Sequence, residues 1–415
     1  MRRPFIALAV AEIFSITGSR LAGIAVPWLV LVTTGDPVLT GLVGLCEMLP
    51  YVIAKGLSGP LIDRLGQRRI AFTCDIASAV AIGLVPLLHW LGLLSFPLLL
   101  PIVFVLGMLR GPADAAKIAL TPAVAELAGV PLERVAGVNA AIERTATTAG
   151  LAASGALIAL VGATEVLLLN TAAFLIAATI IRFGIPDLPP PASREARPGT
   201  YWQDLRAGWT FLRGDTVLLS LMIMVAVTNL LDQAYGAILA PVWVRDHGHG
   251  PEILGLLFAI FTGAAIAGAG LAAAFAHRLP RLLVYTAAFI ICGLPRFMIF
   301  AIDTPLWAML AVLAIGGFAS GFINPVIGAV MIERIPKPMI GRVTAMTGAV
   351  SWILLPFGGL VGGALIVTFG LAAAFWITGL AFFAATLVPL VIPSFREMNR
   401  RAVVVPEPRG STSSP

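Results

Sequence analysis

The sequence predicts an all-α membrane protein in which twelve transmembrane helices form two six-helix bundles. Hydrophobic residues make up 59% of the 415-residue chain and charged residues only 12%, whereas soluble domains carry about 25% charged residues. The mean hydropathy is +0.97. The apolar runs approach the ~20 residues that a helix needs to cross a bilayer. These observations leave too little polar sequence for a separate soluble domain.

Twelve apolar runs follow one another between clusters of Pro, Gly and charged residues. They cover residues 5–32, 38–62, 70–90, 96–124, 136–161, 165–183, 216–243, 253–276, 282–302, 306–332, 342–368 and 371–392. The first run follows two arginines, as in a secretion signal, but it continues to Val32 without a cleavage site, which predicts a retained helix. Lipid offers no partner to an unpaired backbone group, and the alternation typical of a membrane barrel is absent from the sequence. We therefore expect helices throughout.

The positive charges predict the orientation and the division of the chain. They gather in alternate connections, at Arg2 and Arg3, 64–69, Arg134, 182–213, 278–281, 334–342 and the tail from Arg396, and the opposite connections hold only Arg245. The positive-inside rule then places both termini in the cytoplasm. We expect an N-terminal bundle (1–183), a cytoplasmic linker (184–215), a C-terminal bundle (216–392) and a disordered cytoplasmic tail (393–415). Within the linker, Trp202, Leu205, Trp209 and Leu212 have the spacing of an amphipathic interfacial helix.

The two halves also repeat in sequence. Residues 133–162 align without a gap on 341–370, with Arg134 on Arg342. The aligned glycines that we expect to permit close helix packing are Gly150, Gly155, Gly358 and Gly363. A six-plus-six repeat in a membrane protein indicates a transporter with its site near mid-membrane, between the halves.

Ionisable residues inside the predicted spans are the candidate functional residues. They are Glu12, Arg20, Glu47, Lys55, Arg110, Asp114, Lys117, Glu143, Arg144, Asp232 and Arg296. Each costs roughly 2.5–3.5 kcal/mol if it faces lipid at mid-helix, so they are expected to face one another or a wet cavity. Those nearest the centres of their spans are Arg20, Arg110 and Asp232, the last with Asn229 and Gln233 beside it.

The same residues suggest separate roles. Glu47 and Asp232 are the leading proton carriers, because a carboxylate withdrawn from water can bind and release a proton near neutral pH. Asp114 continues a polar stripe from Arg110 on the fourth span and is a further candidate. For Lys55, Lys117, Glu143 and Arg144, a structural ion pair and a transport role remain open. For Arg296 and Glu12, a structural ion pair is the favoured interpretation.

Several classes of function are excluded by what the sequence lacks. It contains no nucleophile, zinc-protease or Walker motif, so neither enzyme activity nor ATP-driven transport is expected. Cys46, Cys74 and Cys292 lie inside apolar runs, and His247 and His249 have no further ligand nearby, so no metal or other cofactor is expected. The net charge of +6 is spread over loops, which favours membrane topology over nucleic-acid binding.

The stretch GPLIDRLGQRR (59–69) resembles the signature between the second and third helices of the major facilitator superfamily, Gly-x-x-x-Asp-Arg-x-Gly-x-Arg-Arg. The matching residues are Gly59, Asp63, Arg64, Gly66, Arg68 and Arg69. VPWLVLVTTGDP (26–37), DLRAGWTFLRGD (204–215) and IPKPMIGRVTAM (335–346) are similar to the macrolide and multidrug efflux branch. The fifth helix keeps the glycines of an antiporter Gly-Pro-x-x-x-Gly element but lacks its proline. Arg110 matches a fourth-helix arginine of drug:proton antiporters.

This resemblance implies two bundles that rock about a cavity lined by the first, fourth, seventh and tenth helices, the last of which contributes Asn324. It implies a monomeric exporter in a bacterial inner membrane that exchanges hydrophobic or amphipathic drugs for protons, driven by the proton motive force. Exporters of one natural product, such as a siderophore or a self-made antibiotic, are the alternative. A membrane receptor without transport is disfavoured by the short loops and the mid-span charges.

The signature stretch itself is expected to act as a conformational latch. Asp63 would lie at the positive N-terminus of the eleventh helix, near Arg342, in one conformation. Its role would then be to hold that conformation, without touching the substrate.

Overall fold

The computed structural model describes residues 3–186, 200–275, 280–302, 304–336 and 339–391. Across these ranges the chain is helical, and twelve helices are long and apolar enough to cross a membrane. This confirms the predicted all-α membrane fold with twelve spans.

Seven helices make up the first half. They are α1 (Arg3–Thr34), α2 (Pro37–Leu57), α3 (Gly59–Leu65), α4 (Gln67–Trp90), α5 (Phe96–Ala128), α6 (Leu132–Val161) and α7 (Ala163–Gly184). Local signals set their ends. Asp36 caps α2 by accepting hydrogen bonds from the amides of Val38 and Leu39 at 2.7 and 3.3 Å. Gly129 ends α5 in the left-handed region, with a φ of +63°.

The second half contains more and shorter elements. They are α8 (Thr200–Gly214), α9 (Thr216–Ala234), the π-helix η1 (Tyr235–Leu239), α10 (Ala240–Asp246), α11 (Pro251–Phe275), α12 (Arg281–Cys292), α13 (Leu294–Ala301), α14 (Leu306–Ser320), α15 (Ile323–Arg334), α16 (Ile340–Trp352), the 3-10 turn η4 (Leu355–Phe357), α17 (Gly358–Phe369) and α18 (Leu371–Val391). Four spans are therefore built from several pieces: α9–η1–α10, α12–α13, α14–α15 and α16–η4–α17.

Prolines explain two of these interruptions. Pro241 has no amide proton to donate to the carbonyl four residues earlier, and the helix just before it widens into the π-turn, where the amide of Ala240 donates to Tyr235. Pro356 lies within η4. Both sites are in the second half, on the seventh and eleventh spans.

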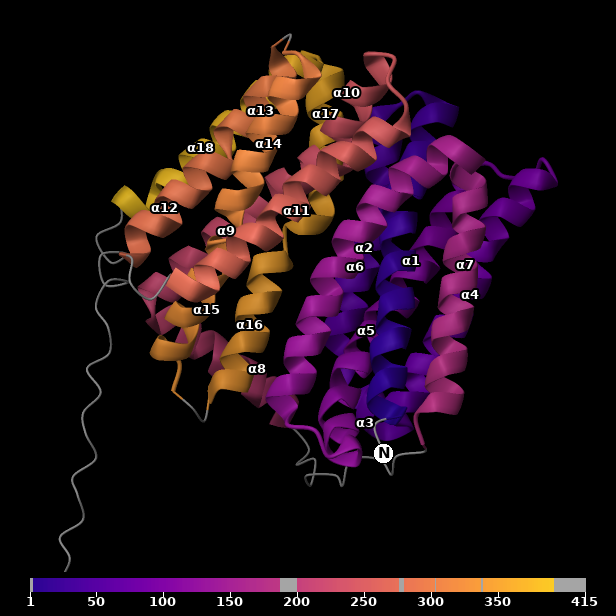
Figure 1. The fold of residues 1–415 in the computed structure, drawn as a ribbon, viewed down its shortest axis with the longest axis vertical. Coiled ribbons are helices and arrows are strands. Elements are labelled where there is room, and N and C mark those ends of the chain that lie inside the picture. The colour runs from indigo at the N-terminus through magenta and orange to yellow at the C-terminus, as the bar shows by residue number, and fades with distance from the viewer. Residues whose placement is uncertain (1–2, 187–199, 276–279, 303, 337–338, 392–415) are drawn as a thin grey trace, which may run out of the picture.

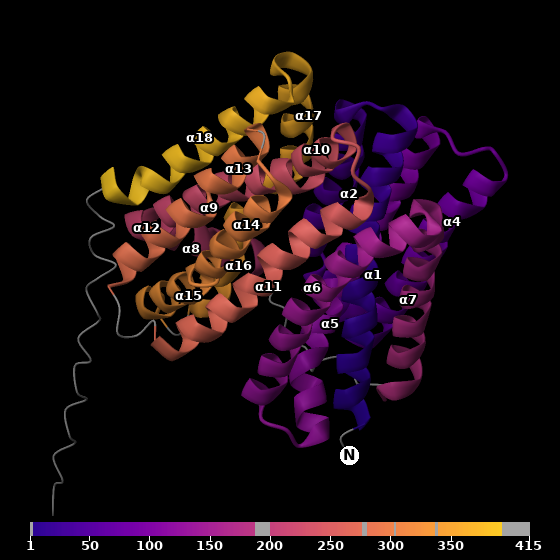
Figure 2. The same ribbon diagram turned by 45° about the horizontal axis from the view of Figure 1, so that its top comes forward.

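The halves form two bundles that meet at one end of the molecule (Figures 1 and 2). We call the end that carries α10 the contact end, and the end that carries the N-terminus, α3 and α8 the terminal end. Between the halves, α6 packs on α11 and α2 packs on α17. Toward the terminal end the two bundles diverge. Arg245 also joins the halves at the contact end, where its Nη1 donates to the Gly35 carbonyl at 3.2 Å.

Glycines allow both contacts between the bundles. A Cβ on Gly155 of α6 would lie 2.7 Å from the Cα of Gly255 in α11. A Cβ on Gly363 of α17 would lie 2.6 Å from the carbonyl oxygen of Pro37 in α2. Gly155 and Gly363 are aligned in the sequence repeat, so they occupy equivalent places in two pseudo-symmetric bundles.

The second glycine pair of the repeat behaves in the same way. Gly150 lies against Arg20 of α1, whose Cβ is 2.9 Å from the position a side chain would take. Gly358 lies against Gln233 of α9, with a corresponding distance of 2.6 Å. Each glycine thus holds its helix close to the first helix of its own bundle.

The signature stretch differs from the expected loop. The second span, expected over 38–62, ends at Leu57, and Gly59–Leu65 forms the separate helix α3. Ile62 is buried in an apolar cluster with Leu8, Ile70, Leu120 and Ile181. This contact fixes α3 to the terminal end of the first bundle. Burial of one apolar side chain explains why a charged, glycine-bounded stretch forms a short helix here.

Candidate functional site

A ladder of polar side chains joins α2 to α5 in the first bundle. Glu47, Tyr51 and Lys55 follow one another at four-residue steps on α2, and Arg110 and Asp114 face them from α5. The Arg110 Nη1 lies 2.5 Å from the Glu47 Oε1. The Tyr51 hydroxyl donates to the Asp114 Oδ2 at 3.0 Å and accepts from the Lys55 Nζ at 3.0 Å. These five residues are called the α2–α5 ladder.

Two glycines of α5 bring the ladder together. A Cβ on Gly111 would lie 2.6 Å from the Tyr51 carbonyl oxygen and 2.6 Å from the Lys55 amide nitrogen. A Cβ on Gly107 would lie 3.1 Å from the Glu47 carbonyl carbon and closer still to its oxygen. Because neither position has a side chain, the two backbones approach closely enough for short side-chain contacts.

The Glu47–Arg110 pair is largely withdrawn from solvent. The side chains are 5% and 11% exposed, and the Arg110 guanidinium also lies 5.5 Å from the centre of the Tyr51 ring. A buried carboxylate is tolerated when a cation and hydrogen bonds compensate it. The carboxylate of such a pair can bind a proton when the arginine moves away from it. Proton coupling requires a group that binds and releases a proton in this way. Sequence reasoning selected Glu47, Arg110 and Asp114, but it missed Tyr51, which connects Asp114 to Lys55.

A second buried pair lies deeper in the first bundle. The Lys117 Nζ is 2.9 Å from both Asp75 carboxylate oxygens and donates to the Ser15 hydroxyl at 2.6 Å. The side chains of Lys117 and Asp75 are 4% and 1% exposed. The sequence alone leaves both a structural and a transport role open for Lys117 and does not single out Asp75. A lone carboxylate inside an apolar run was the signal that could have identified it.

The second bundle holds its own carboxylate–arginine pair. Arg296 of α13 donates through Nη2 to the Asp232 Oδ1 of α9. The two side chains differ in exposure, with 6% for Arg296 and 44% for Asp232. Four aromatic rings surround the guanidinium, with ring centres 4.8 to 5.7 Å away, and belong to Tyr235, Phe261, Phe297 and Phe382. The cation–π contacts and the burial fix Arg296, while the carboxylate of Asp232 stays accessible.

The remaining cavity candidates are spread over several helices. Arg20 is exposed on α1, and its Nε donates to the Thr147 hydroxyl at 3.1 Å. Asn229 donates to the Ser351 carbonyl at 2.9 Å. Gln233 is half-buried on α9, and Asn324 is exposed on α15. The structure therefore brings Glu47, Arg110 and Asp114 into one cluster, whereas Asp232 lies in the other bundle.

The latch residues lie on and beside α3. Gly59 begins α3, and Asp63 and Arg64 are exposed on it. The Asp63 side chain makes no hydrogen bond or ion pair with the part of the chain that the structure describes. The Arg342 side chain lies outside the described residues. The latch thus stays a prediction about another conformation.

The end of the signature stretch connects α3 and α4 to α7. Gly66 has a φ of +87° between the two helices, a conformation that favours glycine. Arg68 donates to the carbonyls of Ile181 and Arg182 near the C-terminal end of α7, where a cation is favourable. Arg69 is exposed.

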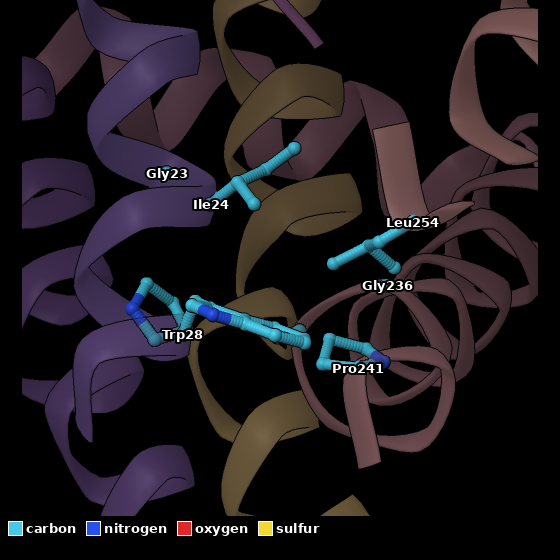
Figure 3. A pocket seen from close by; sticks show the side chains of 8 residues that line it. Gly23, Ile24, Trp28, Gly236, Pro241 and Leu254 are labelled. Atoms are coloured by element: carbon cyan, nitrogen blue, oxygen red, sulfur yellow. The ribbon is translucent and has the colours of Figure 1, made fainter. Parts of the chain in front are cut away.

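A small cavity lies between the bundles at the contact end (Figure 3). Its volume is about 10 Å³, enough for about one water molecule. The residues that line it are Gly23, Ile24, Pro27, Trp28, Gly236, Ala237, Pro241 and Leu254. Trp28 of α1 extends toward Pro241 of the opposite bundle. Here the bundles leave no room for a drug-sized ligand.

Metal ligands are not grouped in the described ranges. No cluster of three or more His, Cys, Asp and Glu side chains suited to a metal ion occurs among the residues that the structure describes. The three cysteines are free thiols. His247 stacks on Trp243, with ring centres 4.2 Å apart, and its Nδ1 donates to the Trp243 carbonyl oxygen at 2.9 Å.

Comparison with known proteins identifies the family. The sequence model of the Major Facilitator Superfamily matches residues 8–231 and 221–413. The fold agrees with this match: the nucleoside transporter NupG superposes with a TM-score of 0.70 at 14% identity, covering 95% of this chain and 98% of that one. A D-xylose–proton symporter superposes with a TM-score of 0.70 at 16% identity over 92% and 96% of the two chains. The chain belongs to the Major Facilitator Superfamily and is a multi-pass membrane protein.

Two relatives refine this placement within the family. The multidrug efflux pump Tap of Mycobacterium tuberculosis is 28% identical over 401 residues, covering 96% of this chain and 95% of the pump. Macrolide efflux protein A of Streptococcus pyogenes is 20% identical over 401 residues, covering 95% and 97%. The predicted resemblance to the drug-efflux branch is confirmed.

Proposed function

We propose that this protein exports hydrophobic or amphipathic drugs from the bacterial cytoplasm in exchange for protons, by alternating access. One observation carries the proposal. Each bundle places a carboxylate–arginine pair inside its membrane spans, Glu47–Arg110 in the first and Asp232–Arg296 in the second. Intramembrane ion pairs of this kind mark ion and substrate pathways. The proton motive force supplies the energy, and no cofactor is required.

The distribution of arginines supports a cytoplasmic location for the terminal end. On this assignment the bundles meet at the outer face and diverge toward the cytoplasm, so the conformation is open to the inside. A drug would enter between the bundles from the cytoplasmic side. Rocking of one bundle against the other would then close that side and open the outer one.

The two pairs differ in a way that suits coupled exchange. Asp232 is the more exposed carboxylate, at 44% against 5% for Glu47. The apolar spans around Asp232 would accept a bulky apolar ligand. The few charged side chains nearby would do little to exclude such a ligand. Relatives that are named for multidrug and macrolide efflux support drug-like substrates.

The first test measures coupling in proteoliposomes. We expect Glu47→Gln and Asp232→Asn to abolish drug-driven proton movement, because an amide cannot carry the proton. Glu126→Gln is the matched control, since Glu126 is exposed at the end of α5. Coupling that survives in both variants would show that other carboxylates carry the proton.

The second test identifies the substrates. A drug-susceptibility panel is measured in a strain without its major pumps, with and without an uncoupler. We expect expression to protect against several unrelated drugs and the uncoupler to remove the protection. Protection against none, together with loss of one secreted metabolite in a deletion strain, would instead indicate a dedicated natural-product exporter.

A further inference from the structure

One end of the α2–α5 ladder contacts the opposite bundle. The Lys55 Nζ lies 5.4 Å from the ring centre of Trp352, the last residue of α16. Trp352 is 42% exposed, so this is not a contact within a packed core. A lysine ammonium at this distance from an indole ring is attracted to its face. The ladder is therefore linked to the second half of the molecule through Lys55.

This contact lies at the edge of the region where the bundles meet. On the side of the contact end, α2 and α17 touch through their backbones at Gly41 and Gly359. On the side of the terminal end, the bundles diverge (Figure 1). The eleventh span is also interrupted just after Trp352, before α17 begins at Gly358. Lys55 thus meets the second bundle at the place where a rocking motion would pivot.

The other end of the contact leads to a titratable group. The Lys55 ammonium donates to the Tyr51 hydroxyl oxygen at 3.0 Å, and the same hydroxyl donates its proton to the Asp114 carboxylate at 3.0 Å. The Asp114 carboxylate is the hydrogen-bond acceptor at this end of the chain. Asp114, Tyr51, Lys55 and Trp352 form a continuous chain from a carboxylate of the first bundle to an aromatic ring of the second.

We propose that Tyr51 and Lys55 are positioning residues that hold the present conformation only while Asp114 is ionised. A proton taken from water converts the carboxylate to a neutral acid, which can donate to the Tyr51 oxygen in place of Lys55. The ammonium of Lys55 then loses both its acceptor and the nearby negative charge. The Lys55 ammonium then moves away from the Trp352 ring, and the two bundles can rock against each other. This inference rests on the proposed proton-coupled exchange.

A contact that depends on the charge of Asp114 would meet a requirement of drug–proton exchange. If the empty, deprotonated protein could change conformation, protons would leak inward without any drug moving outward. A contact that holds this state, and that protonation releases, prevents the empty transition. A drug that enters between the bundles and displaces Trp352 would release it equally.

Several charged groups besides Lys55 face Asp114, and the test has to separate them. Those that interact electrostatically with Asp114 are Glu12 and Arg20 on α1, Tyr51 on α2, Asp75 on α4 and Arg110 on α5. These groups in turn interact with Glu47 on α2, Lys117 on α5 and Glu143 on α6. Asp114→Asn keeps the shape of the side chain and removes its titration. A pH response that depends on Asp114 therefore disappears in this variant, whatever the other groups do.

The experiment measures the separation of the bundles in the full-length protein without drug. Spin labels are placed at Leu127→Cys on α5 and Thr344→Cys on α16, both exposed near the terminal end, after Cys46, Cys74 and Cys292 are replaced by serine. Distances are measured by double electron–electron resonance in nanodiscs over a pH series. The readout is the population ratio of long to short distances.

We expect the wild-type ratio to fall on acidification. Tyr51→Phe, Lys55→Met and Trp352→Leu should lower the ratio at the highest pH of the series by about two- to thirtyfold, the range that one cation–π contact supplies. Their response to pH should be small. Lys55→Arg keeps a cation at this position and should keep the wild-type response to pH. Ile53→Val, on the exposed side of α2, is the matched control and should behave as wild type.

Proton leak gives an independent readout in vesicles without drug. Lys55→Met and Tyr51→Phe should leak protons faster than wild type, whereas Ile53→Val should not. A wild-type pH response in both Lys55→Met and Tyr51→Phe, or in Asp114→Asn, overturns the proposal. If Lys55→Met fails to fold, as shown by gel filtration, Trp352→Leu on the other bundle decides by the same criterion.

The outcome is separate from that of the proposed function. If drug-driven proton movement is absent but the pH response depends on Lys55 and Tyr51, the exchange function is wrong and the positioning role stands. If drug exchange is coupled to protons but these variants respond to pH as wild type does, the exchange function stands and the positioning role is wrong.

Discussion

Replacing Gly41 by alanine should separate the two bundles at the contact end. A Cβ at this position would lie 2.6 Å from the carbonyl carbon of Gly359 and 2.8 Å from the amide nitrogen of Leu360. Both are backbone atoms, so no side chain can rotate away. The helices α2 and α17 have to move apart by about 1 Å to reach ordinary carbon contact distances.

The magnitude follows from the cost of overpacking. Extra atoms in a tightly packed contact cost roughly 1–3 kcal/mol. That cost applies only to the conformation in which α2 and α17 touch, because the opposite conformation would part them. A difference of this size changes the ratio of the two conformations by about 5–150-fold. Gly41→Ala should therefore raise the ratio of the conformation open at the contact end to the present conformation by that factor.

The assay uses labels at the contact end. Leu93→Cys, between α4 and α5, and Ile302→Cys, after α13, are both exposed and belong to opposite bundles. Electron–electron resonance should report a longer distance for Gly41→Ala than for wild type. Gly44→Ala is the matched control, because a Cβ there meets nothing within 4 Å. A wild-type distance distribution in Gly41→Ala, or an equal shift in Gly44→Ala, would refute the reasoning.

Two further changes test other parts of the first bundle. Lys117→Met leaves the Asp75 carboxylate buried without its cation and should destabilise the protein by about 3–5 kcal/mol. Thermal unfolding in detergent measures the loss of stability. The double variant Lys117→Met with Asp75→Asn should recover most of the lost stability. An unchanged unfolding temperature in Lys117→Met alone would contradict the prediction. Asp63→Asn should reduce transport while drug binding, measured by fluorescence quenching, persists. Lost binding would show that Asp63 is not a latch.

The spans were predictable because each depends on its own local composition. Hydropathy and the spacing of Pro, Gly and charges set twelve runs, and these runs correspond to the twelve membrane-length helices of the described chain. The internal breaks were not predictable in the same way. The π-turn before Pro241 and the interruption before Gly358 lie inside continuous membrane-spanning runs. Proline marks the positions but does not determine which backbone geometry relieves the missing hydrogen bond.

The candidate site was predictable as residues but not as pairs. The cost of a charge in lipid drew attention to Glu47, Arg110 and Asp232, and helical spacing extended the stripe on α5 to Asp114. Tyr51 was missed because an isolated tyrosine in an apolar span gives no sign of a polar role. Pairings such as Arg110 with Glu47 link residues that are 63 positions apart. They follow from packing that no local pattern contains.

The ion pairs lie within the bundles, and the closest backbone contacts lie between them. This arrangement explains how the bundles could move at a low cost in free energy. Among the described residues, the ion pairs within the spans join helices of the same bundle: the buried pairs Glu47–Arg110 and Asp75–Lys117, and the half-exposed pair Asp232–Arg296. The closest backbone approaches between the bundles are at glycines of α2–α17 and α6–α11, and the polar contacts between the bundles that are described above are the single Lys55–Trp352 and Arg245–Gly35 contacts. Parting two glycine surfaces loses only dispersion contacts, whereas parting a buried ion pair leaves uncompensated charges. A rocking motion would therefore leave every one of these pairs intact.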